Sequence, residues 1–539
     1  MRKLSTQKTL SALASAALFC SGLALFSSAA VAQNGNWLTS GGDVQRSGWN
    51  KDEKTLNKSN VGNMKLLWKT KTDVYPHGLH TLMDPLVVQN VPTPSGPKEM
   101  VYILGVGDTL YAFDAKSGTI AWQKQFKYEV PPPARPPDGA PARPAQVLPT
   151  DTRHYNFLNP GGSTDVPVIG EPDAKGVRPI YVLDGGGNLH VLSDVTGEDL
   201  KPEIKTGATS KFALQLWNNS IVYAGRGGIY SVELATGKVI PSKGFGGGGG
   251  LWGRRGPVIT SDGVVWTTTG DGIYDPSKPN NLVLGNSVVG FELKDGAWQV
   301  KDWFTPPNWD WLRRRDLDPN NTPTSFMFKG KEYMAASGKE CRLYLLDPAN
   351  MGGPDHHEPL LKTPLICNEA VDFASAGSWG AVSSYLDAKG TRWVLVPFWG
   401  PKHSGIKFPI ENAPATKEGG VAAFKLIEKD GKPAYEPVWV SRDMFRGEPP
   451  IVANGVVYTW GSGDDTQQVW PDIGLNFDSS NRAALSNHVT VFALDAETGK
   501  ELWSSKEIIT SFNHFTGITV ANGKVYMSSY DGNVYCFGL

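Results

Sequence analysis

Two aspartates stand one residue apart in a polar segment near the middle of the chain. An arginine is followed by Asp316, a leucine and Asp318. In an extended segment, residues two apart face the same side, so both carboxylates can reach one hard cation such as Ca²⁺. A carboxylate can also remove the proton of a hydroxyl group as a general base. The three arginines of 313–315 leave a second interpretation open, in which a polar loop has its acids neutralised.

Residues on both sides of this pair could also act as a base, bind a metal ion or stack on a ligand. Asp310, in an Asn-Trp-Asp-Trp phrase, is the alternative base. Asp271 follows Thr-Gly and offers a hard oxygen ligand, although Asp-Gly is also a very common turn dipeptide. Trp252 follows the glycine run 246–250 and has a flat indole on which a planar ligand can stack. Packing is the alternative role for Trp252. The glycines could let the backbone bend sharply or approach a ligand closely, or they could form a flexible loop.

A recurring phrase indicates which elements position these residues. Residues 110–122 read LYAFDAKSGTIAW and residues 491–503 read VFALDAETGKELW, and weaker copies occupy 190–197 and 230–237. Each copy is a hairpin of a sheet that cannot bury both faces alone, so the copies must stack. Radial stacking of such sheets gives a β-propeller.

The strand pattern predicts the blades and their closure. Strand groups are expected near 84–123, 163–215, 217–245, 256–303, 323–366, 378–440, 449–505 and 516–539. The last group lacks an outer strand, whereas residues 63–69 form a strand without a partner. Pairing the two removes two sheet edges. We therefore predict an all-β fold, an eight-bladed β-propeller of four-stranded antiparallel blades, whose ring is closed by the N- and C-terminal strands. Seven blades remain an alternative because 125–215 is irregular.

The N-terminus predicts export. Residues 1–32 have a basic start, an apolar stretch and an Ala-Val-Ala cleavage site, so we expect a cleaved signal peptide and one propeller domain over 33–539. No later segment is long and apolar enough to span a bilayer. Removing the signal takes the formal charge from −1 to −4, which does not favour a nucleic-acid partner. The expected location is the periplasm.

Three cysteines remain after the signal peptide is removed. An oxidising compartment makes a disulfide between Cys341 and Cys367 plausible. Cys536 lies in an alternating strand and is expected to be a buried thiol. There is no Cys-x-x-Cys-His, so a covalently attached c-type haem is not expected.

In its repeats and in the order of its central motifs, the chain resembles the pyrroloquinoline quinone (PQQ)-dependent alcohol dehydrogenase superfamily of eight-bladed propellers. The central motifs are Leu-Trp-Gly-Arg at 251–254, Thr-Gly-Asp at 269–271, and Phe-Thr-Pro-Pro-Asn-Trp-Asp at 304–310. The resemblance covers nearly the whole mature chain. It implies PQQ as cofactor together with Ca²⁺ or a lanthanide.

The same resemblance implies roles for individual residues. Trp252 would be the floor beneath the quinone, and Asp271 and Asp318 would bind the metal. Asp316 would be the catalytic base, with Asp310 as the rival alignment. Lys339 matches the cation that touches the quinone oxygens, where it would stabilise developing negative charge.

Two departures from the superfamily pattern weaken this assignment. No two cysteines are adjacent, although many of these enzymes cap the quinone with a vicinal pair. The expected metal-binding glutamate is replaced in the segment 224–230, where Arg226 stands instead. Arg226 must then point away from a metal ion or bind a carboxylate of the cofactor.

Two functional hypotheses follow. The first is a periplasmic quinoprotein oxidoreductase that oxidises an alcohol or polyol by hydride transfer to bound PQQ, with a metal ion as Lewis acid. Its electrons would leave to a separate cytochrome c or quinone. The alternative is a non-catalytic periplasmic propeller that has lost the cofactor and serves as a scaffold or binding protein. The missing cysteines and glutamate favour the alternative, and the series Trp252, Asp271, Asp316 and Lys339 favours the enzyme.

Overall fold

Antiparallel strands make up almost all of the regular structure. The computed structural model describes residues 35–76, 80–128, 164–210, 212–367, 376–465 and 483–539. The predicted signal peptide, 1–32, lies outside these residues. In the described part, the helical elements are a 3₁₀ turn, η1 (Val61–Asn63), one short helix, α1 (Trp309–Arg313), and a helical turn at residues 483–485. The prediction of an essentially all-β chain is confirmed.

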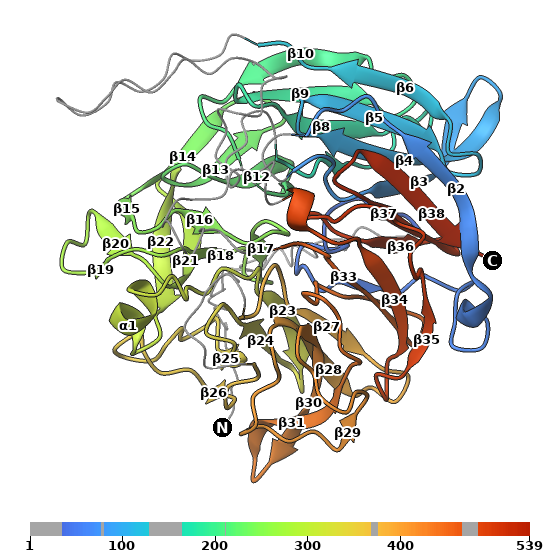
Figure 1. Ribbon diagram of the computed structural model, residues 1–539. Helices are drawn as coiled ribbons and strands as arrows, with labels where there is room; N and C mark the ends of the chain where they lie inside the picture. The colour runs from blue at the N-terminus through green and yellow to red at the C-terminus, as the bar shows by residue number, and fades with distance from the viewer. Residues whose placement is uncertain (1–34, 77–79, 129–163, 211, 368–375, 466–482) are drawn as a thin grey trace, which may run out of the picture. The chain divides into compact units, whose positions relative to one another are not determined.

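Four-stranded antiparallel groups recur along the chain (Figure 1). The first contains β3 (Leu86–Thr93), β4 (Gly96–Gly105), β5 (Thr109–Asp114) and β6 (Ile120–Gln125). The second contains β7 (Val168–Ile169), β8 (Pro179–Leu183), β9 (Asn188–Ser193) and β10 (Asp199–Lys205). The third contains β11 (Gln215–Trp217), β12 (Ser220–Gly225), β13 (Gly228–Glu233) and β14 (Val239–Lys243).

The middle of the chain continues this pattern with an insertion. One group contains β16 (Leu251–Trp252) and β17 (Val258–Ile259), which both pair with β18 (Val265–Thr269), and then β21 (Val288–Lys294) and β22 (Ala297–Phe304). Strand β22 also pairs in parallel with β14, which joins this group and the third into one nine-stranded sheet. A small three-stranded sheet is formed by β15 (Phe245–Gly247), β19 (Tyr274–Asp275) and β20 (Leu282–Leu284). The next group contains β23 (Thr324–Phe328), β24 (Lys331–Ala336), β25 (Tyr344–Leu346) and β26 (Leu361–Lys362).

The remaining sheets lie in the C-terminal third. One contains β27 (Ser383–Leu386), β28 (Arg392–Trp399), β29 (Ile410–Glu411), β30 (Gly419–Lys429) and β31 (Lys432–Val440). Another contains β32 (Ile451–Ala453), β33 (Val456–Gly461), β34 (Thr490–Asp495) and β35 (Glu501–Ser504), with β1 (Trp49–Asn50) parallel to β32. The last contains β36 (Thr519–Ala521), β37 (Lys524–Ser528) and β38 (Asn533–Gly538).

The last sheet takes its fourth strand from the beginning of the chain. Strand β2 (Lys65–Lys71) pairs antiparallel with β38, with Thr70 opposite Val534 (Figure 1). This is the pairing that the unpartnered strand at 63–69 predicts. It leaves β38 hydrogen-bonded on both sides, which removes an exposed sheet edge.

The glycine and the tryptophan of the repeated phrase meet between successive sheets. Gly118, Gly197 and Gly499 all have φ near +70°, which favours glycine. A Cβ at these positions would overlap the indoles of Trp68, Trp122 and Trp439, respectively. The indole nitrogens of Trp68 and Trp439 donate hydrogen bonds to backbone carbonyls three residues before Gly118 and Gly499, at 3.0 and 3.1 Å. Each such tryptophan therefore docks one sheet onto a turn of the next.

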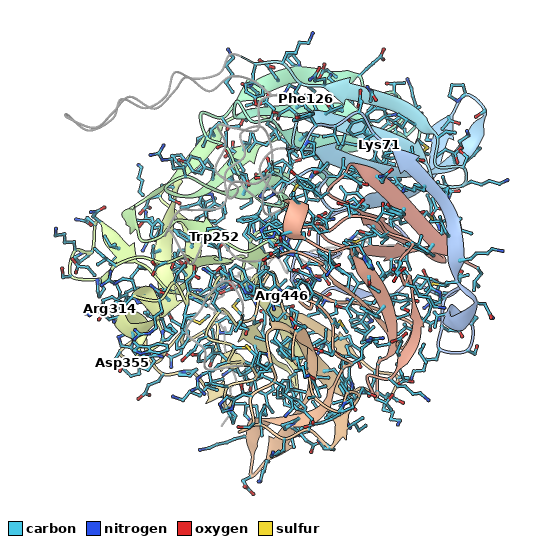
Figure 2. The ribbon with its side chains drawn as sticks, viewed as in Figure 1. Lys71, Phe126, Trp252, Arg314, Asp355 and Arg446 are labelled. Atoms are coloured by element: carbon cyan, nitrogen blue, oxygen red, sulfur yellow. A yellow bond between two sulfur atoms is a disulfide. The ribbon has the colours of Figure 1, made fainter. Side chains whose placement is uncertain are left out.

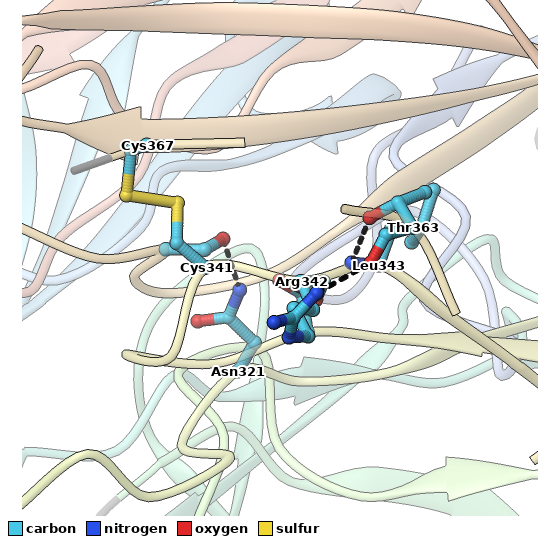
Figure 3. Close-up of a disulfide and its surroundings, with 8 residues drawn as sticks. Asn321, Cys341, Arg342, Leu343, Thr363 and Cys367 are labelled. Atoms are coloured by element: carbon cyan, nitrogen blue, oxygen red, sulfur yellow. Dashed lines mark hydrogen bonds between the residues drawn. A yellow bond between two sulfur atoms is a disulfide. The ribbon is translucent and has the colours of Figure 1, made fainter. Parts of the chain in front are cut away.

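The hydrophobic core lies between neighbouring sheets, where these tryptophans dock. One buried cluster contains Trp393 of β28 together with Val457 of β33 and Leu494 of β34. Cys536 is a buried free thiol, and Cys341 and Cys367 form a disulfide (Figure 3), as the sequence predicts.

The glycine run 246–250 makes close backbone contacts. A Cβ on Gly248 would overlap the backbone of Leu284 and Gly285, and one on Gly249 would overlap Gly270. The structure thus shows close packing of this backbone against another segment, and a close approach to a ligand stays a prediction.

Candidate functional site

The two aspartates of the central segment follow helix α1. Leu317 closes the turn after the helix, because its backbone N–H donates to the carbonyl of Leu312 at 3.0 Å. Asp316 has φ of 54°, a left-handed conformation that non-glycine residues seldom adopt. Such backbone strain concentrates at functional sites. The side chain of Asp316 is about one-third exposed, whereas Asp318 is buried.

Lys339 is held against this loop by its backbone. Its N–H donates to the carbonyl of Asp318 at 3.0 Å. The preceding Gly338 lies so close to Pro319 that a Cβ would overlap its backbone. On the other side, a Cβ on Gly377 would meet the Lys339 backbone. The lysine therefore leaves the main chain at a fixed point next to both aspartates.

The ammonium group of Lys339 bridges the two carboxylates. Its Nζ lies 2.6 Å from Oδ1 of Asp316 and 2.7 Å from Oδ1 of Asp318. Burial alone would lower the pKa of Lys339, but the charges of Asp318 and Asp316 outweigh it and raise that pKa. Burial raises the pKa of Asp318 to about 6, against the opposing effect of Lys339. The lysine thus stays charged in a site that water barely reaches.

The side chain of Lys339 packs against aromatic rings. The ammonium lies 5.0 Å from the ring centroid of Trp379, within the range of a cation–π contact. Trp379 itself stacks on Trp399, with centroids 4.7 Å apart and planes at 19°. Sequence reasoning missed Trp379. The signal available was the Gly-Ser-Trp-Gly stretch at 377–380, and it resembles many other turns in the chain.

Trp252 lies in β16, at the edge of its sheet and opposite Thr268 (Figure 2). Its indole Nε1 donates to the carbonyl of Gly249 at 3.1 Å, so the glycine run fixes the orientation of the ring. A Cβ on Gly270 would overlap the same indole. The ring is only half-buried, which leaves part of it accessible.

Asp271 follows that glycine and connects the tryptophan to the charged cluster. Its side chain is exposed. Partial burial and the negative charge of Asp316 raise the pKa of Asp271, while Lys339 acts in the opposite direction. Asn286 lies next to this turn, because its side-chain N–H donates to the carbonyl of Gly272 at 3.0 Å. Trp252, Asp271, Asp316, Asp318 and Lys339 are therefore brought into one neighbourhood.

The other two candidates have different partners. Asp310 lies on α1 and forms ion pairs with Arg313 at 3.0 Å and Arg314 at 2.8 Å. Arg314 is at the outer end of the helix (Figure 2). Arg226 is exposed in the turn between β12 and β13. Its carbonyl accepts a hydrogen bond from the hydroxyl of Tyr230 at 3.0 Å.

The residues fit a planar polar ligand better than a metal ion. In the described part of the chain, no three His, Cys, Asp or Glu side chains converge as a metal site would require. The nearest oxygens of Asp316 and Asp318 already contact an ammonium group. In contrast, the buried Oγ1 of Thr268 and Oδ1 of Asn286 have no hydrogen-bond partner among the described residues. Orphaned polar atoms beside an accessible indole suit a flat ligand with hydrogen-bonding edges.

A second buried ion pair, which the sequence motifs did not indicate, lies two residues beyond Trp252. Arg254 pairs with Glu448, and both side chains are at least 95% buried. Arg254 also lies over the ring of Phe515 at 5.2 Å, and a Cβ on Gly380 would contact its guanidinium. Gly380 follows Trp379, so this pair borders the lysine cluster.

The recurring antiparallel sheets give the chain a β-propeller fold similar to that of several solved alcohol dehydrogenases. The quinohemoprotein alcohol dehydrogenase of Comamonas testosteroni is similar, with a TM-score of 0.55 and 14% identity over 94% of this chain and 81% of that one. A europium-containing methanol dehydrogenase matches with a TM-score of 0.53 and 13% identity over 94% and 98%. The quinohemoprotein alcohol dehydrogenase ADHIIG of Pseudomonas putida HK5 matches with a TM-score of 0.53 and 14% identity over 94% and 80%.

These likenesses show the fold. No protein-family model and no curated protein matches the sequence. None of the helices in the described ranges has the length and apolar character needed to cross a bilayer.

Proposed function

We propose that this chain is a PQQ-dependent oxidoreductase that oxidises an alcohol or polyol. The observation that carries the proposal is the Lys339 ammonium, held within 2.7 Å of both Asp316 and Asp318 on a propeller of the quinoprotein type. Asp271 connects this cluster to the accessible indole of Trp252. A base, a cation and an aromatic surface thus lie in one neighbourhood.

The proposal also includes the number of blades, the closure of the ring and the location of the protein. The four-stranded groups and the β2–β38 pairing support an eight-bladed closed ring over 33–539. The N-terminal sequence supports removal of residues 1–32 and a periplasmic location. Electrons would then pass to a separate cytochrome c or quinone.

The residues of the chain have distinct roles in this reaction. Asp316 is the partly exposed carboxylate and accepts the proton of the substrate hydroxyl. Asp318 is buried and holds Lys339 in place. Lys339 presents a fixed positive charge to an oxygen that becomes negative during the reaction. Trp252 would stack on the cofactor, which when bound supplies the hydride acceptor.

Asp310 and Arg226 have smaller parts in the proposal. The two ion pairs of Asp310 on α1 favour Asp316 as the base. Arg226 has an exposed side chain and could reach only a ligand that extends to the β12–β13 turn.

Titration of the mature protein with PQQ, followed by tryptophan fluorescence, tests the proposal. We expect saturable quenching near one equivalent that is lost in Trp252→Ala. The matched control is Trp311→Ala, which removes a 42% exposed tryptophan on α1 and should leave binding intact. Asp316→Asn should keep PQQ binding and lose alcohol oxidation with an artificial electron acceptor. Absence of PQQ binding, with or without added metal, would overturn the enzyme assignment and favour the scaffold.

A further inference from the structure

The positive charge in the candidate site comes from a side chain. Lys339 Nζ lies between Asp316 Oδ1 and Asp318 Oδ1, at distances typical of strong charge-assisted hydrogen bonds. Two carboxylates on one loop are the donors that a Ca²⁺ or lanthanide site would require. Here one oxygen of each is already bound to the ammonium group.

The remaining donors do not complete a metal site around this lysine. Ca²⁺ takes six to eight oxygen ligands at about 2.3–2.6 Å. Asp271 interacts with Asp316 through space, and it is exposed. Within the described ranges, no three acidic, histidine or cysteine side chains gather closely enough to bind a metal.

The lysine cannot easily move aside to admit a metal ion. Its backbone is fixed by Asp318 on one side and by Gly377 on the other. Its ammonium lies on the face of Trp379, which is backed by Trp399. The disulfide between Cys341 and Cys367 anchors the chain two residues further on (Figure 3). A metal ion entering the gap would also face repulsion from a buried positive charge.

We propose that Lys339 takes the place of a metal ion, so that the site binds no Ca²⁺ or lanthanide and uses the ammonium as its only cation between Asp316 and Asp318. This use of the charge in catalysis rests on the function proposed above. The exclusion of the metal rests on the ion pairs alone. It is an alternative to the expectation, taken from the superfamily resemblance, that Asp271 and Asp318 bind a metal.

Tb³⁺ luminescence excited through tryptophan tests the proposal without quinone or substrate. Trp379 is close enough to the gap to sensitise a bound ion. The wild-type mature protein should give no saturable signal near one equivalent of Tb³⁺. Lys339→Met should acquire one, since the two carboxylates lose their cation, and Tb³⁺ should raise its melting temperature. The double variant Lys339→Met/Asp318→Asn should lose the signal again.

The control is Lys331→Met, which removes a more exposed lysine paired with Asp347 and should gain no Tb³⁺ signal. If Lys339→Met does not fold, the wild type decides the question. Stoichiometric binding of Tb³⁺ or Ca²⁺ by the wild type that disappears in Asp318→Asn would overturn the proposal, and its absence would support it. PQQ binding in the presence of EDTA is measured separately, so a failure of the quinone assignment is distinguishable from a failure of the metal-free site.

Discussion

Arg254 and Glu448 are 194 residues apart in the sequence and form a buried ion pair. Arg254 follows the β16 strand that carries Trp252, and Glu448 precedes β32. The pair therefore connects two sheets that are distant along the chain. It borders the lysine cluster through Gly380, which contacts the Arg254 guanidinium and follows Trp379.

Removing the arginine should destabilise the protein strongly. Arg254→Met leaves Glu448 buried without its partner, so we expect a loss of about 3–5 kcal/mol in the free energy of unfolding. Urea denaturation at pH 8 measures it. Arg442→Met, which breaks the exposed pair with Glu501, is the matched control and should cost at most about 1 kcal/mol. Equal losses in both variants would contradict this account.

The same pair predicts a pH dependence of stability. Burial raises the pKa of Glu448 from 4.5 to about 7, although Arg254 opposes the shift. The folded state then holds this proton more tightly than the unfolded state does. Its contribution to stability is present below pH 4.5 and is lost as the pH rises toward 7.

Glu448→Gln removes this titration. Between pH 4.5 and 7, its free energy of unfolding should fall less than that of the wild type, by an amount on the order of 1–3 kcal/mol. Urea denaturation at several pH values gives the difference. Identical pH profiles for the two proteins would show that folding does not raise the pKa of Glu448.

The disulfide should contribute to stability and to the position of Lys339. Cys341 and Cys367 are 26 residues apart, so chain entropy predicts a cost of about 3 kcal/mol for Cys341→Ser/Cys367→Ser. Denaturation with and without a reductant measures this cost. The wild type should become as labile as the variant only when reduced. An oxidised wild type no more stable than the variant would contradict the prediction.

The stability contributed by docking a tryptophan on a turn glycine can be measured separately from the cost of backbone strain. Gly499 and Gly237 occupy the same position in the repeat, with φ of 69° and 72°. A Cβ on Gly499 would overlap Trp439, whereas one on Gly237 would make an ordinary contact with Ile204 at 3.7 Å. Both alanine variants lose about 1 kcal/mol to strain. Gly499→Ala should lose about 1–3 kcal/mol more, measured by thermal denaturation.

Much of the fold was accessible from the sequence because each repeat contains its own strand, turn and tryptophan. The strand at 63–69 and the incomplete group at 516–539 indicated their pairing, since each lacked what the other had. The disulfide could also be predicted, because few cysteines remain in the mature chain.

The site was only partly accessible from the sequence. The motif order identified Asp316, Asp318 and Lys339, and the structure places them in contact. Local sequence could not show that the lysine would bridge both aspartates, because this depends on the packing of Gly338 and Gly377. Nor could it indicate Trp379 or the Arg254–Glu448 pair, whose partners come together only through contacts between separate sheets.

The pairing of β2 with β38 also constrains the order in which the molecule can be completed. Strand β2 is synthesised long before its hydrogen-bonding partner β38. Until the final residues are available, β2 and the sheet that it completes both have an open edge, which other strands can pair with. Premature termination near residue 533 would therefore leave defects at both ends of the chain. Because β2 and β38 lie side by side in one sheet, residues 33–539 are a candidate for circular permutation, with new termini in an exposed turn such as that at Gly296.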